Sequence, residues 1–589
     1  MKKTLILSVS SLIVVLLALW LPRGLALDRF ATVDEPRWLM RSANFYHALS
    51  QKEWGYTFQR EHPGVTVTWA GAAGFYWKYR SYVDVRPGQI ERPGRLHLFL
   101  RNHKIESLDL LAAGRTFVVL GITVALGLAF LIVWRMLGLL PAVFGFLILS
   151  FDPFQVALSR LLHLDGLVSA LMLLSLLAFA SYRYHGHRAI DLLLSAATAG
   201  LAWLTKSPAF FLIPFLGLWV GVEWMAGQTQ KSGRARRLAP TGERRVDNPP
   251  YRPTPTGMLV RSMWREFSPL LVWAAVAAAV FVLLWPAMWV DPLGSLSRVF
   301  SLASTYASEG HDSRLFFGGV IYDIGQSPWY FYPVAYLWRA TPASLLGLIL
   351  AWLGLLGPRS LRISPERRRL VLVLLIFSVL FTLFLSLSAK KFDRYLLPVF
   401  APLDLVAGIG WLWLAGAISN GFGRAPNMIW RLGAGLLLGA AFLSQVAGTL
   451  QSAPYYLSYY NPLMGGLRKA PEVMLVGWGE GLDQAARYLN GKPGAEEMKV
   501  ISWSADGCFS YFFKGSAGTI DYDMDVRALR RGDYVVFYLN QVQRQAPNPE
   551  ILDYFARFEP EYVVRIGGVE YAWVYNMQDA PPLETEAQP

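Results

Sequence analysis

Three carboxylates occupy positions from which they could do chemistry at the face of a membrane. Asp34 and Glu35 follow the first hydrophobic stretch of the chain, and Asp165 begins a later one. A carboxylate beside a hydroxyl group can accept its proton, which makes the hydroxyl oxygen a better nucleophile. We therefore predict that Asp34 is catalytic, and we take Glu35 and Asp165 as further catalytic candidates.

Each of these carboxylates also has a structural explanation. Pro36 is typical of the first turn of a helix, so Asp34 or Glu35 could cap that helix, which leaves the other carboxylate free. Asp165 could stabilise the N-terminus of its own helix, or pair with the nearby Arg160. The residues alone leave these roles open beside the catalytic ones.

Basic residues near the same boundaries could hold the phosphate group of a substrate. Arg160 lies close to Asp165 in the sequence, and Lys206 follows an apolar stretch, where it could instead snorkel to the interface. Lys391 and Arg394 belong to a Lys-Lys-Phe-Asp-Arg segment that the topology below places outside, where cations are usually depleted. An anionic phosphate ligand would explain cations on that side.

The composition is that of a polytopic α-helical membrane protein. Of the 589 residues, 54% are hydrophobic and only 16% are charged, whereas soluble domains average about a quarter charged. A stretch of about 20 apolar residues can cross the bilayer as a helix. Eleven such stretches are predicted, at 4–21, 113–137, 140–157, 166–184, 190–205, 207–226, 269–288, 337–357, 370–388, 395–415 and 432–450.

The distribution of charge predicts the orientation in the membrane. Lys2 and Lys3 precede the first stretch, so the positive-inside rule leaves the N-terminus in the cytoplasm, with a cleaved signal peptide as the alternative. Alternating the following loops places every strongly basic loop inside. The net charge of +14 is thus explained by topology, not by nucleic-acid binding. We predict a multi-pass protein of the plasma membrane with an extracytoplasmic C-terminal domain.

Two predicted outer loops are too long to be simple connections. The loop 22–111 contains a helix that begins near Pro36, and it contains His62 in the sequence Glu-His-Pro-Gly. We take His62 as a candidate acceptor or loop residue, although a lone histidine is usually structural. The loop 289–336 is rich in aromatic residues, which is typical of an interfacial belt, and sugar stacking is the alternative.

The chain divides into a membrane domain, 1–450, and an extracytoplasmic domain, 451–589. In the second, the β-rich segments 498–503, 534–539 and 562–574 and a helix near 480–489 predict a small α/β fold. The glycines on either side of Trp478 are no phosphate loop, because the lysine and the spacing of such a loop are missing. Cys508 is the only cysteine, which excludes an intramolecular disulfide.

These motifs resemble those of the C-type glycosyltransferases that use polyprenyl-phosphate sugars. Asp34-Glu35 is similar to the acidic motif in their first outer loop. His62-Pro63 resembles the His-Pro of the protein O-mannosyltransferases, and 159–165 resembles their Ser-Arg-x-x-x-Leu-Asp. Segments 204–208 and 391–398 are similar to those of the lipid A aminoarabinose transferases and prokaryotic homologues. The resemblance covers roughly residues 1–415. The sequence shows no sign of the β-trefoil-type repeat domain of the eukaryotic O-mannosyltransferases, and the tail 451–589 has no counterpart in these families.

The resemblance implies a glycosyltransferase that acts at the outer face of the membrane. Such an enzyme moves a sugar from a polyprenyl-phosphate donor to a hydroxyl of a protein, lipid or glycan, with inversion. By this resemblance Asp34 would be the base, and Asp165 would orient the acceptor or support the base. The residues expected to contact the donor phosphate are Arg160, Lys206, Lys391 and Arg394.

The resemblance leaves the need for a metal open. A divalent metal could bridge Asp34 and Asp165 to the phosphate, as in some C-type relatives, but the mannosyltransferase branch works without one, so we predict no cofactor. The expected partners are the lipid-linked donor, a hydroxyl acceptor and the bilayer. A non-catalytic glycan-assembly protein and a lipid or sugar transporter remain the alternatives. A transporter should show inverted repeats and broken midplane helices, and the sequence shows neither clearly.

Overall fold

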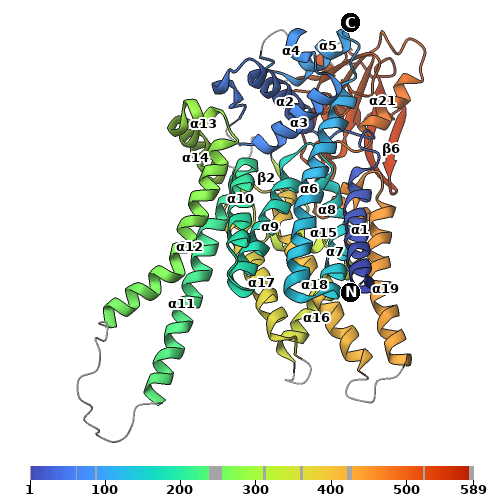
Figure 1. The fold of residues 1–589 in the computed structure, drawn as a ribbon. Coiled ribbons are helices and arrows are strands. Elements are labelled where there is room, and N and C mark those ends of the chain that lie inside the picture. Colours follow the sequence, from blue (N-terminus) through green and yellow to red (C-terminus); the bar gives the residue numbers. More distant parts are fainter. Residues whose placement is uncertain are drawn as a thin grey trace, which may run out of the picture.

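In the computed structural model, long helices form a bundle, and a smaller domain with a β-sheet covers one end of it (Figure 1). The structure describes residues 2–60, 63–85, 89–237, 255–308, 314–357, 362–420, 428–521 and 524–582. The C-terminal domain lies at the covered end, next to the short helices α2 to α5, which fall within residues 35–102 (Figure 1). This end therefore combines parts of the chain that are far apart in sequence.

The bundle contains the predicted membrane helices. Among the described residues, seven helices are long and apolar enough to span a membrane, or nine if each of two bent pairs counts as one span. The seven spans are in α6 (Ser107–Leu137), α9 (Leu164–Tyr184), η2–α11 (Ser207–Phe211 and Leu212–Arg237), α12 (Pro255–Leu283), α17 (Pro365–Ser386), η4–α18 (Asp393–Leu396 and Leu397–Ser419) and α19 (Met428–Gln451). Shorter apolar stretches lie in α1 (Lys2–Gly24) and α10 (Ala189–Thr205). Each of the eleven predicted stretches overlaps one of these elements, so the polytopic helical fold is confirmed.

Two of the predicted spans are bent. α7 (Leu139–Ser150) meets α8 (Pro153–Ser159) at 70°, and α15 (Phe331–Arg339) meets α16 (Pro342–Leu356) at 113°. In both pairs a proline begins the second helix, and proline cannot continue the hydrogen bonds of the preceding one. The residue before each proline also caps the new helix, since Asp152 and Thr341 accept bonds from backbone N–H groups. Hydropathy alone missed both bends.

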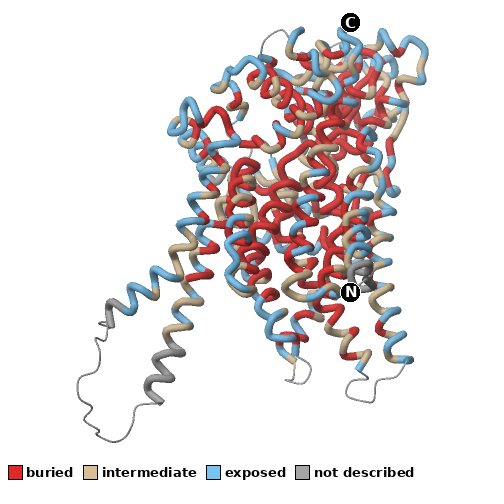
Figure 2. The backbone as a smooth tube through the Cα atoms, viewed as in Figure 1, coloured by how far each residue is buried: buried red, intermediate tan, exposed pale blue. Residues whose placement is uncertain are grey.

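Helix α9 lies at the centre of the bundle. It is buried from Leu164 to Ser181 and packs against α6, α10 and α18, because it is apolar around nearly its whole circumference. Figure 2 shows the same continuous buried interior, which extends from the bundle into the covering domain. The first turn of α9, with Asp165, is thereby held at the junction between the two domains.

Residues 22–111, predicted as the first outer loop, form short helices that lie at one end of the bundle, beside the C-terminal domain (Figure 1). The helix predicted to begin near Pro36 is confirmed as α2 (Glu35–Ser50), which buries Trp38, Leu39 and Phe45 and packs against α3. The remaining outer elements of the membrane domain are η1 (Trp54–Thr57), α3 (Val65–Lys78), α4 (Tyr82–Val85), α5 (Pro93–Asn102), α13 (Ala287–Val290), α14 (Pro292–Ser308) and the antiparallel pair β1 (Leu315–Phe317) and β2 (Val320–Tyr322).

The C-terminal domain contains a five-stranded sheet of order β4-β3-β5-β7-β6. Strands β3 (Lys499–Ser502), β4 (Ser516–Thr519) and β5 (Tyr534–Tyr538) are parallel, and β6 (Tyr562–Ile566) and β7 (Val569–Asn576) form an antiparallel hairpin beside them. Four of the strands fall within or next to the predicted β-rich segments. Strand β4 was not predicted, because three of the four residues in Ser-Ala-Gly-Thr are small and have little preference for strands.

The helices of this domain are short. They are η6 (Tyr456–Ser458), η7 (Pro462–Met464), α20 (Gly466–Val473), α21 (Leu482–Asn490), α22 (Val526–Leu529), α23 (Leu539–Gln543) and α24 (Pro549–Phe555). Of these, α21 and α23 pack against the sheet. The predicted helix near 480–489 is α21. Cys508 is buried, as expected of a structural thiol.

Candidate active site

Asp34 lies where the first outer loop meets the bundle. Its Oδ2 atom is 3.5 Å from Nε2 of His163 and 3.4 Å from Nη2 of Arg394. Asp34 occupies the cap position of α2, but its side chain makes no capping hydrogen bond. The side chain is 28% exposed and lines a cavity. Helix capping therefore does not occupy this carboxylate, which stays available to a ligand.

A chain of charged groups continues from Asp34 into the bundle. His163 places Nδ1 3.3 Å from Oδ2 of Asp165. The ammonium of Lys206 donates a hydrogen bond of 2.5 Å to Oδ1 of Asp165, and Nε of Arg394 is 3.6 Å from Oδ2. We call these five side chains the charged cluster. Four of them were predicted site residues, and helix ends at the end of the bundle that the C-terminal domain covers bring them together.

The charged cluster sets the protonation of its two groups that lie outside the membrane helices. Burial alone would raise the pKa of Asp34, but the hydrogen bond with His163 and the charges of Arg394 and Arg37 outweigh it and hold that pKa below its ordinary value. Burial lowers the pKa of His163, but Asp165 and Asp34 raise it more, so the net pKa is above the ordinary value. Asp34 is thus ionised at neutral pH, as a base must be.

Glu35 has an entirely different set of partners. Nε of Arg115 donates a hydrogen bond of 2.7 Å to Oε1, and Nη2 of Arg115 pairs with Oε2. Oε1 also accepts a hydrogen bond from the backbone N–H of Leu162 (2.8 Å), and Oε2 accepts two from Thr32 (2.9 Å each). The side chain is fully buried. Glu35 therefore connects α2 to α6 and to the loop that precedes α9.

Two of the predicted phosphate ligands lie away from the charged cluster. Arg160 is buried, and its guanidinium donates to the carbonyl oxygens of Pro22, Leu25 and Ala26. Lys391 donates a hydrogen bond of 2.8 Å to Oγ of Ser327 and lines a small hollow beside the main cavity. The candidate His62 lies outside the described residues.

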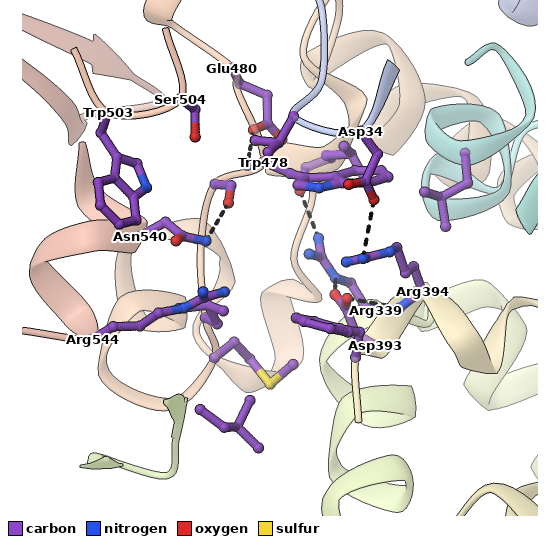
Figure 3. Close-up of a pocket in the computed structure, with 18 of the residues that line it drawn as sticks. Asp34, Arg339, Asp393, Arg394, Trp478, Glu480, Trp503, Ser504, Asn540 and Arg544 are labelled. Carbon is purple, nitrogen blue, oxygen red and sulfur yellow. Dashed lines mark hydrogen bonds and ion pairs between the residues drawn. The ribbon is translucent and has the colours of Figure 1, made fainter. Parts of the chain in front are cut away.

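The cavity beside Asp34 lies between the two domains. It has a volume of about 280 Å³. Figure 3 shows Asp34, Arg394 and Arg339 of the membrane domain on one side and Trp503, Asn540 and Arg544 of the C-terminal domain on the other. The C-terminal domain, to which the sequence analysis assigned no role, therefore supplies a large part of the candidate site.

A glycine-rich loop of the C-terminal domain fixes this arrangement. Trp478 stacks its ring edge to face with His163, at 5.0 Å, and lies 4.4 Å from the guanidinium of Arg394. Its carbonyl oxygen accepts a hydrogen bond of 3.2 Å from the backbone N–H of Val33. Gly479 has a φ of +117°, and a Cβ atom there would come within 2.5 Å of a backbone oxygen of the first outer loop. Only glycine fits there, so the loop holds Trp478 rigidly over the charged cluster.

A second, more apolar cavity opens on the other side of Lys206. It has a volume of about 240 Å³, and its lining includes Phe384, Leu385, Leu387 and Tyr395 together with Lys206. The Lys206 ammonium lies 3.9 Å from the centre of the Tyr395 ring. We call this cavity the apolar groove. Its wall is mostly apolar, and Lys206 of the charged cluster supplies a positive charge to it.

Sequence reasoning missed several residues of the site. His163 had a usable signal, because it lies two residues before Asp165 in the motif already singled out. Trp478 lies between two glycines, and this segment was considered only as a possible phosphate loop. Trp503 and Asn540 had no signal, since only the folded sheet brings the ends of β3 and β5 to the cavity.

The raised pKa of His163 predicts how stability depends on pH. A group whose pKa is higher in the folded than in the unfolded state stabilises the fold fully below the unfolded value, about 6.5 for histidine, and this contribution is lost as the pH rises through the folded value. The unfolding temperature of the purified protein should therefore fall as the pH rises above about 6.5. His163→Gln should flatten this slope. The exposed His103 is the control, and an unchanged slope in His163→Gln with a changed one in His103→Gln would contradict the assignment.

The charged cluster contains two carboxylates and a histidine, which are residue types that bind metals, together with two cations. Within the described ranges, no group of three or more His, Cys, Asp or Glu side chains is arranged to hold a metal ion. Asp34 and Asp165 face His163 from opposite ring nitrogens, and Arg394 and Lys206 already supply positive charge there. We derive no step through a metal.

Several solved structures are similar to this chain. ArnT from Cupriavidus metallidurans in the apo state has 15% identity and a TM-score of 0.46, over 99% of this chain and 100% of that chain. ArnT bound to undecaprenyl phosphate has 15% identity and a TM-score of 0.43, over 98% and 99%. The archaeal oligosaccharyltransferase AglB from Archaeoglobus fulgidus, in complex with an inhibitory peptide and a dolichol-phosphate, has 13% identity and a TM-score of 0.46, over 98% and 75%.

No family model and no curated protein matches the chain. The similar structures belong to proteins of the kind that the sequence motifs resemble. Because their TM-scores lie below 0.5, we take the function from the geometry of the site.

Proposed function

We propose that this protein is a membrane glycosyltransferase that moves a sugar from a polyprenyl-phosphate donor to an acceptor hydroxyl. One observation carries the proposal. Asp34 is ionised, its side chain makes no capping hydrogen bond, and it is partly exposed in a cavity of about 280 Å³. It belongs to the charged cluster, which also borders the apolar groove through Lys206. A base for the acceptor thus lies near a site suited to a lipid-linked phosphate.

The proposed reaction is a single displacement. Asp34 takes the proton of the acceptor hydroxyl while its oxygen forms a bond to the anomeric carbon on one face of the sugar. The bond from that carbon to the phosphate oxygen breaks on the opposite face, and its electron pair leaves with the phosphate. The products are an inverted glycoside and the polyprenyl phosphate. No redox partner is needed.

The cations stabilise the leaving phosphate in this scheme. Lys206 and Arg394 already pair with Asp165, and positive groups fixed in place stabilise developing negative charge without reorganising. The donor chain would occupy the apolar groove, where aliphatic and aromatic side chains replace lipid as its surroundings. Asp165 would then hold Arg394 in position, and His163 would hold Asp34. This is the supporting role expected of Asp165.

The buried partners of Glu35 and Arg160 support positioning roles for both. Glu35 would fix the backbone that carries Asp34, and Arg160 would fix the turn after α1 through three carbonyl oxygens. We further propose that the site faces the extracytoplasmic side, because the basic loops of the sequence alternate to the opposite side.

Loss of Lys391 and Arg394 should weaken donor binding. A hydrogen bond to a charged group contributes about 1.5–3 kcal/mol, so the double variant to Ala should bind at least roughly tenfold more weakly. Binding of undecaprenyl phosphate to the purified protein in nanodiscs measures this directly. Lys469→Ala, which removes an exposed cation of the C-terminal domain, is the matched control. Equal affinity of the double variant and the control would exclude these two residues as phosphate ligands.

The proposed function itself is tested by turnover of the donor. The purified protein in liposomes should release polyprenyl phosphate from a radiolabelled polyprenyl-phosphate sugar when supplied with an extract that contains the acceptor. Label should appear in the acceptor in equal amount. Movement of the intact donor across the membrane without cleavage, whether with or against its concentration gradient, would instead identify a transporter.

A further inference from the structure

The carboxyl ends of two parallel strands, β3 and β5, meet at the cavity beside Asp34. Trp503 and Ser504 directly follow β3, and Asn540 lies in α23, directly after β5. All three residues line the cavity. In open α/β sheets, ligands bind beyond the carboxyl ends of parallel strands. The chemistry proposed above uses none of these residues, so this edge of the sheet has no assigned ligand.

A second cavity extends the same edge. It has a volume of about 230 Å³ and shares Arg37, Trp503 and Ser504 with the first. It is also lined by Asp521, which follows β4, the next strand of the sheet. Neighbouring strands lie about 4.8 Å apart. The two cavities therefore form one surface that runs from Asp34 across three strand ends. We call it the strand-end surface, formed by Glu480, Trp503, Ser504, Asp521, Asn540 and Arg544.

The position of this surface relative to Asp34 is fixed. The hydrogen bond from Val33 to Trp478 joins the residue before Asp34 to the glycine-rich loop. Asn540 Nδ2 donates a hydrogen bond of 2.9 Å to the carbonyl oxygen of Gly477 in the same loop. A ligand held on the strand ends would thus meet Asp34 in one defined orientation, as in-line attack requires.

The side chains of the surface match the chemistry of a sugar. Trp503 offers an aromatic ring, which packs against apolar C–H groups. Glu480 lines the first cavity with a carboxylate that can accept hydrogen bonds, and its Oε2 already accepts them from Trp478 and Tyr538. Ser504 adds a hydroxyl that can donate and accept. A sugar has apolar ring faces that can pack on the aromatic ring and hydroxyls that can bond to the carboxylate and the hydroxyl. A purely apolar or purely anionic ligand would leave one of these two kinds of group without a contact.

We propose that the strand-end surface binds the acceptor and that the acceptor is a saccharide of more than one ring. This inference rests on the proposed function. One ring would lie in the first cavity with its reacting hydroxyl at Asp34, and the next would continue past Trp503 into the second. A peptide acceptor fits less well, because peptides that recognise a sheet add along an unpaired strand. Here the cavities meet the ends of the strands instead.

The test measures saccharide binding by the purified full-length protein. The fluorescently labelled protein in detergent is applied to an array of cell-surface oligosaccharides and to a matching array of peptides rich in Ser and Thr. The wild type should retain a subset of the oligosaccharides and none of the peptides. Trp503→Ala should weaken retention roughly tenfold, through the lost ring contact. Asn540→Ala should weaken it roughly fivefold, through one lost hydrogen bond.

A matched control and a folding check accompany these variants. Arg565→Ala removes an exposed side chain of the same domain that pairs only with Glu570 in the described contacts, and it should bind like the wild type. If Trp503→Ala unfolds, Asn540→Ala and Ser504→Ala decide the matter. No retained oligosaccharide, retention of peptides instead, or oligosaccharide binding that none of the folded variants weakens would each overturn the inference.

Asp34→Asn separates this inference from the proposed function. That variant should bind the same oligosaccharides as the wild type, because it leaves the strand ends intact. If the wild type binds saccharides through Trp503 but never turns over a lipid-linked donor, the proposed function fails, and only the binding of saccharides by the strand-end surface stands. If donor turnover depends on Asp34 but only peptides accept the sugar, the function stands and the inference fails.

Discussion

Replacing Asp34 by Asn is expected to lower the rate of sugar transfer by roughly 10²–10⁴-fold, the usual contribution of a general base. Asn keeps the size of Asp but cannot take the proton of the attacking hydroxyl. The Asp34 side chain makes no capping hydrogen bond, and its partners His163 and Arg394 have further partners, so the variant should fold. The rate is measured with the purified protein and a radiolabelled polyprenyl-phosphate sugar.

Two comparisons make this result specific. Asp28→Asn changes an exposed carboxylate of the same loop and should leave the rate unchanged. Binding of undecaprenyl phosphate by Asp34→Asn should stay near the wild-type level, so that the loss lies in kcat rather than in donor affinity. Near-wild-type transfer by the folded variant would exclude Asp34 as the base.

Replacing the neighbouring Glu35 by Gln is expected to lower the free energy of unfolding by roughly 3–5 kcal/mol, because a buried charge loses its partner. The amide would turn an N–H₂ group toward the donors of Arg115 or Thr32, where Glu35 now accepts hydrogen bonds. Thermal unfolding of the purified protein measures the loss. The exposed Glu106, at the start of α6, provides the control Glu106→Gln.

A double variant tests the cause of that loss. Combining Glu35→Gln with Arg115→Met removes both buried charges, so it should unfold at a higher temperature than Glu35→Gln alone. Equal stability of Glu35→Gln and the wild type would contradict the structural role. The pair Asp34 and Glu35 would then need the opposite assignment, with Glu35 as the reacting carboxylate.

Much of the membrane domain could be predicted from the sequence, because a lipid environment leaves few choices. Apolar stretches must form helices there, since every backbone group needs a partner within its own segment. The bends before Pro153 and Pro342 could not be predicted from hydropathy, because hydropathy is averaged over a window and does not register single prolines. The strand β4 was missed for a related reason, because its small residues carry little strand preference.

The candidate site was predictable in part. Asp34, Asp165, Lys206 and Arg394 were selected as charges at membrane boundaries, where a charge is costly unless it has a partner or a task. The sequence could not separate Asp34 from Glu35, since only the position of Arg115 decides which carboxylate is neutralised. Nor could it place residues of the C-terminal domain beside Asp34, because that proximity depends on packing between distant parts of the chain.

The most direct measurement compares lipid-linked sugars and surface glycans by mass spectrometry in three strains: one with the wild-type gene, one with a deletion, and one carrying Asp34→Asn. The deletion and Asp34→Asn strains should both accumulate a polyprenyl-monophosphate sugar, and both should lose the same sugar from a surface glycan. Restoration of the wild-type gene should reverse both changes. Identical lipid-linked sugars and identical glycans in all three strains would contradict the proposal that this protein is a glycosyltransferase.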